Sequence, residues 1–96
     1  MSIVNVVAAI AAKPGQEKRV EEILMGLVQP SRQDKGCILY DLHRDLDNPG
    51  VFVFYEAWES REMLEAHLNA PHLLAWREKA PELAASMDVK VLEKLS

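Results

Sequence analysis

Apolar positions along the chain fall into stretches with either strand-like or helix-like spacing. Residues 3–11 are almost continuously apolar and begin with β-branched side chains, which predicts a strand buried on both faces. Beyond the break at residues 13–15, apolar residues recur at helical spacing and predict one amphipathic helix: Val20, Ile23, Leu24, Leu27 and Val28. We expect Pro30 to kink or end this helix, because proline lacks the backbone N–H, and Gly36 to be its final stop.

Two further strands are predicted as a hairpin. Residues 37–46 and 51–59 are rich in β-branched and aromatic side chains, and residues 47–50 between them have turn chemistry. If 47–50 forms the loop, one face of the hairpin carries Leu39, Asp41, His43, Phe54, Glu56 and Trp58. The other face then carries Tyr40, Leu42, Val53, Tyr55 and Ala57. A bulge would shift this register by one residue.

The C-terminal part of the chain predicts a split helical region and a last strand. Ser60 is suited to cap a helix whose apolar side holds Met63, Leu64, His67 and Leu68. Pro71 suits the first turn of a second helical piece with Leu73, Leu74 and Trp76, and Pro81 is expected to interrupt that piece. Residues 87–95 are expected to form the last strand.

The predicted order is β-α-β-β-α-β, which indicates one α+β domain over residues 1–96 with the ferredoxin-like antiparallel sheet. Helices in this arrangement cover one face of the sheet. The strands at 3–11 and 51–57 are nevertheless apolar on both faces, so the uncovered face would expose a large apolar surface. We therefore expect a homodimer that packs sheet to sheet through the open face; the alternative is that one strand is misassigned.

Composition and charge narrow the classes of function. The formal net charge of −4 and the scattered basic residues do not favour binding to nucleic acid or to an anionic membrane. Cys37 is the single cysteine, which excludes an internal disulfide and favours a reducing compartment. The first residues do not resemble a signal peptide, and no apolar run approaches the roughly 18 residues of a membrane span. A cytoplasmic location is the expectation.

Candidate chemistry comes from the hairpin and from the few histidines, because no phosphate loop, dinucleotide fingerprint or paired cysteines are present. The hairpin face with His43 and Glu56 would suit the wall of a pocket between sheet and helices. Each candidate also has a purely structural interpretation: a hydrogen-bonded strand histidine for His43, a structural hydrogen-bond network for Asn5, and core packing for the two tryptophans. His67 and His72 straddle a helix break and lack helical metal-site spacing, so no metal site is expected.

The sequence resembles the antibiotic biosynthesis monooxygenase family along nearly its whole length. The resemblance lies in two blocks, Gly-Cys-x-x-Tyr-x-x-His from Gly36 and Phe-x-x-Tyr-Glu-x-Trp from Phe52, and in the segment from His67 to His72. The closest likeness is to stand-alone bacterial members, some of them described as quinol monooxygenases. The resemblance implies a ferredoxin-like fold that dimerises into an α/β barrel.

The resemblance also implies a reaction. Family enzymes oxygenate phenolic or quinol-like polycyclic aromatics with molecular oxygen as co-substrate and without flavin, haem or metal cofactor. A general base would deprotonate the substrate, so that its anion can pass an electron to oxygen. The resemblance assigns catalytic roles to His43 or His67 as the base and to Asn5 as an oxygen-orienting donor. It places substrate-binding side chains at Phe54, Glu56, Trp58, His72 and Trp76.

Two other functions stay open at this stage. The same pocket could hold an aromatic metabolite unchanged in a non-catalytic or stress-associated dimer. Small relatives of similar fold isomerise a phosphorylated signalling sugar, although Lys13, Arg32 and Arg44 are too dispersed to indicate a phosphate pocket. Haem-degrading relatives have a Trp and a ligand His about where this chain has His67 and Trp76, which argues against haem.

Overall fold

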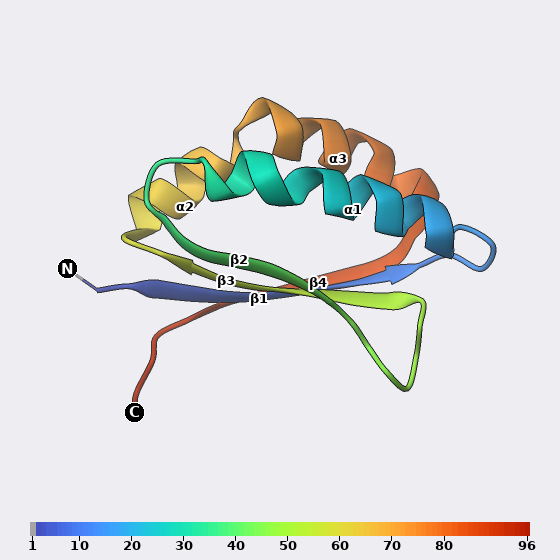
Figure 1. The fold of residues 1–96 in the computed structure, drawn as a ribbon, viewed down its shortest axis with the longest axis horizontal. Helices are drawn as coiled ribbons and strands as arrows, with labels where there is room; N and C mark the ends of the chain where they lie inside the picture. The colour runs from blue at the N-terminus through green and yellow to red at the C-terminus, as the bar shows by residue number, and fades with distance from the viewer. Residues whose placement is uncertain (1) are drawn as a thin grey trace.

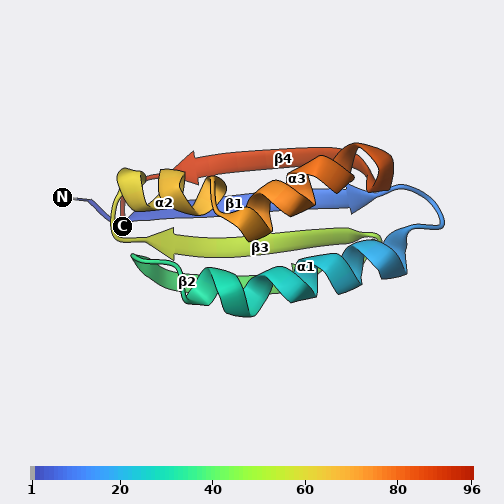
Figure 2. The same cartoon turned by 90° about the horizontal axis from the view of Figure 1, so that it is seen from above.

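The computed structural model describes residues 2–96, and these form one four-stranded antiparallel sheet with three helices on one face (Figure 1). The strands lie in the order β2-β3-β1-β4, which is the ferredoxin-like arrangement predicted from the sequence. The elements are β1 (Val4–Ala12), α1 (Glu17–Arg32), β2 (Cys37–Arg44), β3 (Val51–Trp58), α2 (Arg61–Leu68), α3 (Pro71–Leu83) and β4 (Ala84–Leu92). Seen from above, α1 runs along β2, and α2 and α3 follow one another over the β1 side of the sheet (Figure 2).

Helix α1 has the predicted apolar stripe on the sheet, and its end differs from the prediction. Val20, Leu24 and Leu27 are buried against the core, as the helical spacing indicated. The helix continues through Pro30 to Arg32, so the expectation that Pro30 ends it was wrong. Pro30 lies in the last turn of α1, so its missing N–H removes one hydrogen bond near the helix end. No further turn of the helix depends on that bond. Gly36 then precedes β2 with a φ of 85°.

The second helical region is split as predicted. Ser60 caps α2, and its side-chain oxygen accepts a hydrogen bond from the Met63 N–H at 3.2 Å. Pro71 is the first residue of α3. Pro81 does not interrupt α3, which ends at Leu83, again because the proline falls in the final turn. None of the helices in residues 2–96 is long and apolar enough to cross a membrane.

The last strand begins earlier than predicted. β4 starts at Ala84, three residues before the expected residue 87, because the chain passes from α3 into extended backbone without a turn. Ala84 already pairs with Ala12 of β1.

The two faces of the sheet have different surroundings. On β1 and β3 the even-numbered side chains are buried beneath the helices: Val6, Ala8, Ile10, Phe52, Phe54, Glu56 and Trp58. The odd-numbered side chains point away from the helices and are apolar as well, among them Val7, Ala9, Val53 and Tyr55. Tyr55 is 43% exposed although it lies on a central strand. The core therefore fills the helix side, and the opposite side remains open in the single chain.

Candidate active site

A pocket of about 320 Å³ lies between the helix side of the sheet and the three helices. Most of its wall is aliphatic or aromatic, with contributions from all four strands, including Tyr40 of β2, and from each helix. Glu56, His67 and Arg77 bring a carboxyl group, an imidazole and a guanidinium group to this lining. An apolar enclosure with a few polar groups is the usual form of a small-molecule site.

Glu56 is a buried carboxyl group held by its strand neighbour. Its side chain is on the helix face of β3, and the residue is 5% exposed. The Trp58 Nε1–H donates a hydrogen bond of 2.9 Å to Glu56 Oε1. Burial raises the pKa of Glu56 to about 7, and the hydrogen bond from Trp58 opposes this shift. Near neutral pH this carboxyl group can therefore both accept and release a proton.

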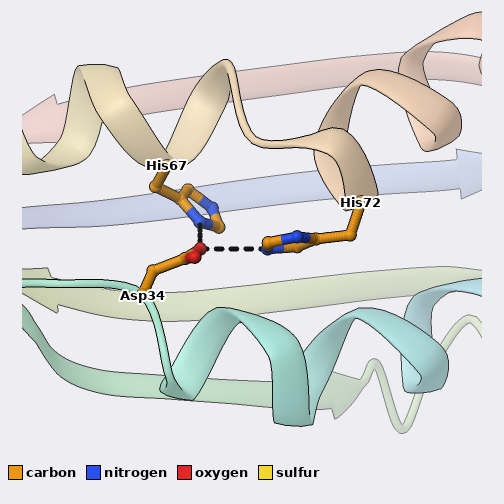
Figure 3. Close-up of side chains that lie close together, drawn as sticks. All are labelled: Asp34, His67 and His72. Carbon is orange, nitrogen blue, oxygen red and sulfur yellow. Dashed lines mark hydrogen bonds and ion pairs between the residues drawn. The ribbon is translucent and has the colours of Figure 1, made fainter.

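His67 and His72 meet at the carboxylate of Asp34 (Figure 3). His67 Nδ1 and His72 Nε2 each lie 2.9 Å from the same oxygen, Asp34 Oδ2. Because a carboxylate only accepts hydrogen bonds, each ring nitrogen donates to it. The second ring nitrogen of a neutral His67, Nε2, then keeps its lone pair and can accept a hydrogen bond.

Three different segments supply this cluster. Asp34 lies in the turn after α1, His67 in the last turn of α2, and His72 is the second residue of α3. The His67 side chain is 1% exposed, whereas those of Asp34 and His72 are about one-fifth exposed. Burial lowers the pKa of His67, and the hydrogen bond that its ring donates to Asp34 opposes the shift. The neutral imidazole is therefore the favoured form.

Aromatic rings fix the position of His67. Its ring lies 4.4 Å from the Trp58 ring, centroid to centroid, and meets Tyr40 edge-on at 5.2 Å. Tyr40 in turn packs on Phe54 at 4.8 Å. Burial raises the pKa of Tyr40, so its hydroxyl stays protonated. The imidazole is thus held between a carboxylate on one side and aromatic rings on others.

The structure brings together most of the site residues expected from the sequence. Glu56, His67, Phe54 and Trp76 line the pocket. Trp58 contacts it through Glu56, and His72 is joined to it through Asp34 and His67.

His43 does not belong to this group, because the predicted hairpin register was wrong by one residue. Leu42 lies opposite Phe54, and His43 lies opposite Val53. The turn begins at Asp45, whose Oδ1 accepts hydrogen bonds from the backbone N–H groups of Asp47 and Asn48, earlier than the expected loop at 47–50. His43 is consequently exposed on the sheet face that points away from the pocket.

Asn5 also lies away from the pocket. It pairs with Ala57 and Leu92 on the odd-numbered face of β1, while its neighbour Val6 lines the pocket. The expectation that Asn5 orients oxygen inside the pocket is therefore wrong for this structure. β1 is apolar on both faces, so the sequence pattern did not show on which face of the sheet the Asn5 side chain would lie.

Sequence reasoning missed Asp34, Tyr40 and Arg77. Asp34 stands in a polar turn that carries no periodic signal, and its role depends on helices that meet it in space. Tyr40 was assigned to the other face by the same register error that misplaced His43. Arg77 lies at the pocket margin, where its Nη1–H donates to the Leu68 carbonyl oxygen at 3.2 Å.

Comparison with known proteins shows relatives over almost the whole chain. The probable quinol monooxygenase YgiN of Escherichia coli strain K12 is 30% identical, with 95% of this chain and 97% of that protein aligned. Rv0793 of Mycobacterium tuberculosis, named "Putative monooxygenase", is 33% identical, with 85% and 80% aligned. A protein of Synechocystis, sll1783, is 32% identical over 79% of this chain, which spans about half (52%) of its length.

Solved structures agree with the fold. PA3566 of Pseudomonas aeruginosa superposes with a TM-score of 0.95 at 32% identity, covering 100% of this chain and 97% of that one. The Rv0793 structure gives a TM-score of 0.93 at 32% identity, with coverage of 99% and 97%. The family model described as "Antibiotic biosynthesis monooxygenase" matches residues 3–79. The chain belongs to the antibiotic biosynthesis monooxygenase family.

Proposed function

We propose that this protein is a monooxygenase that oxidises a phenolic or quinol-like polycyclic aromatic with molecular oxygen. Family membership and the names of its relatives support a monooxygenase activity. For a phenolic substrate, one oxygen atom becomes a new carbonyl at a ring C–H carbon and the other leaves as water. The hydrogens of the ring C–H and the O–H end in that water, so substrate and O₂ give a quinone and water. The substrate supplies all the electrons, and no flavin, haem or metal takes part in the reaction.

The observation that carries this proposal is the buried carboxyl group of Glu56 inside an apolar pocket. A general base works best when its pKa lies near the working pH, and the pKa of Glu56 is about 7. Glu56 takes the proton of the substrate hydroxyl, and the resulting anion passes an electron to O₂ before the C–O bond forms. His67 is the second acceptor in the pocket and orients a substrate oxygen through Nε2.

Oxygen consumption tests this proposal directly. Purified protein treated with a chelator is incubated with anthrones, naphthoquinols and simple catechols, each corrected for its own autoxidation. We expect a protein-dependent rate that falls at least about a hundredfold in Glu56→Gln, in line with the usual contribution of a general base. The control is Glu59→Gln, which changes an exposed carboxylate just past the end of β3 and should keep the rate.

Two results would contradict the proposal. One is the absence of any protein-dependent oxygen uptake across the panel while the ligands still bind and are recovered unchanged, which is the behaviour of a binding protein. The other is an unchanged rate in Glu56→Gln, which would remove Glu56 from the base role.

We also propose that the working form is a homodimer through the open sheet face. The side chains there are mostly apolar, and Tyr55 and Leu92 remain 43% and 41% exposed in the single chain. Soluble monomers rarely leave a contiguous apolar surface of this kind uncovered.

A further inference from the structure

A carboxylate and two imidazoles converge at the edge of the pocket, outside the group assigned to proton transfer. The ligand-type atoms of Asp34, His67 and His72 all lie within 4.8 Å of one another (Figure 3). We propose that these three side chains form a binding site for a divalent first-row transition-metal ion. This inference goes beyond the proposed oxidation, which uses Glu56 and the Nε2 atom of His67 and does not require the ion.

The distances suit shared coordination. Asp34 Oδ2 lies 2.9 Å from His67 Nδ1 and 2.9 Å from His72 Nε2. With metal–ligand bonds of 2.0–2.1 Å, adjacent ligand atoms lie about 3.0 Å apart in an octahedral site and about 3.4 Å apart in a tetrahedral one. Each imidazole nitrogen needs to move only a few tenths of an ångström away from Asp34 Oδ2. The two nitrogens, which lie within 4.8 Å of one another, would come to about 4.1 Å apart on opposite sides of an octahedral ion, or to about 3.4 Å apart in a tetrahedral site. Two hydrogen bonds to Asp34 would be exchanged for three bonds to the metal.

The donor set selects the class of ion. Two imidazole nitrogens and one carboxylate oxygen suit Zn²⁺, Co²⁺, Ni²⁺ or Fe²⁺, whereas Mg²⁺ and Ca²⁺ prefer oxygen ligands alone. The carboxylate of Asp34 offsets part of the charge of the ion. Three protein ligands leave further coordination positions for water.

The surroundings hold the ligands in place. His67 is packed against the Trp58 and Tyr40 rings, and its side chain is 1% exposed. Asp34 and His72 are about one-fifth exposed, which leaves a path from solvent for the ion. The ligands come from the turn after α1, from α2 and from α3, so one ion would tie together three segments above the sheet.

Coordination would also change what His67 presents to the pocket. A metal at Nδ1 replaces the proton that now points at Asp34, and a neutral ring then carries its proton on Nε2. The nitrogen that accepts from a ligand in the metal-free protein becomes a donor. This consequence rests on the proposed function, whereas the binding of the ion does not.

Titration calorimetry with Zn²⁺ on the full chain, freed of metal beforehand, tests the site. We expect one Zn²⁺ per chain, with affinity at least tenfold weaker in His72→Gln and in Asp34→Asn. His43→Gln is the matched control, because it removes an exposed histidine from the opposite sheet face and should leave the affinity unchanged. His72→Gln changes a partly exposed side chain, and circular dichroism verifies that the variant is folded.

Co²⁺ provides a second readout that does not involve activity. Visible d–d absorption bands should appear when Co²⁺ is added to the native protein and should be lost in His72→Gln but kept in His43→Gln. Failure of Zn²⁺ to bind, or equal binding by native protein and folded His72→Gln, would overturn the proposal. Glu56→Gln should bind Zn²⁺ as the native protein does, so a failed oxygenase assay and a failed metal site are distinguished.

Discussion

At the scale of single residues, the carboxyl group of Glu56 makes stability depend on pH. Its pKa in the folded protein is about 7, against an ordinary value of 4.5. Between these values the folded state binds more protons than the unfolded state, so the free energy of unfolding falls as pH rises. Full ionisation should cost about 3 kcal/mol, at about 1.4 kcal/mol per pH unit.

Urea unfolding at pH values between 4.5 and 8 measures this loss. Glu56→Gln should have a flatter pH profile across the same interval, since an amide does not titrate there. The difference in unfolding free energy between the native protein and Glu56→Gln isolates Glu56 from other titrating groups such as His67. A difference that stays constant between pH 5 and 7 would contradict the burial argument.

The Trp58 indole sets where Glu56 titrates. Its Nε1–H donates to Glu56 Oε1 and stabilises the carboxylate, so Trp58→Phe should raise the pKa of Glu56 above about 7. If Glu56 is the base, the pH midpoint of the oxygen-consumption rate should move upward in this variant. Trp76→Phe is the control, because Trp76 lines the pocket while the indole that donates to Glu56 is that of Trp58. The oxygen-consumption rate of Trp76→Phe can differ from that of the native protein, but the pH midpoint of this rate should be the same in both.

At the scale of elements, Gly36 sets the entry into β2 next to the Asp34 turn. Its φ is 85°, and a Cβ at this position would come within 2.6 Å of the Met63 side chain. Gly36→Ala should therefore destabilise the fold by about 1–3 kcal/mol, because a non-glycine residue is strained at positive φ and must also displace Met63.

Gly26→Ala is the opposing control. Gly26 lies inside α1, and a Cβ there would meet nothing within 4 Å. Alanine in an exposed helix interior should stabilise by about 0.5–1 kcal/mol relative to glycine. Thermal or urea unfolding measures the free energy of unfolding of the two variants. An equal change in both would show that the positive φ and the contact with Met63 at Gly36 do not affect stability.

Local chemistry predicted most element boundaries but not all of them. The cap at Ser60 and the helix start at Pro71 were readable because each depends on residues close in sequence. Pro30 and Pro81 do not end their helices, because a proline in the last turn removes only one hydrogen bond near the helix end. The start of β4 was missed because strand pairing with β1, and no local turn, sets it.

The site was predictable only where it depended on periodicity. Glu56 and His67 could be identified because each lies on a repeating face of its own element. His43 was misplaced because a turn that starts at Asp45 shifts every partner in the hairpin by one position. Asp34 could not be found at all, because its relation to two histidines more than thirty positions away arises from packing.

At the scale of the whole molecule, the uncovered sheet face is the feature on which the proposed homodimer rests. Tyr55 lies at its centre, opposite Val7, with half-buried apolar neighbours on β1 and β3. A stable interface of standard size removes about 800 Å² from each chain. Tyr55→Glu places a charge in that interface, which costs free energy unless the charge is paired. We expect the native protein to sediment as a dimer and Tyr55→Glu to sediment as a monomer.

Leu74→Glu is the matched control, because Leu74 is 47% exposed on α3, on the helix side of the sheet. This variant should stay dimeric. A native chain that sediments as a monomer at every concentration would mean that the open apolar face is tolerated in water.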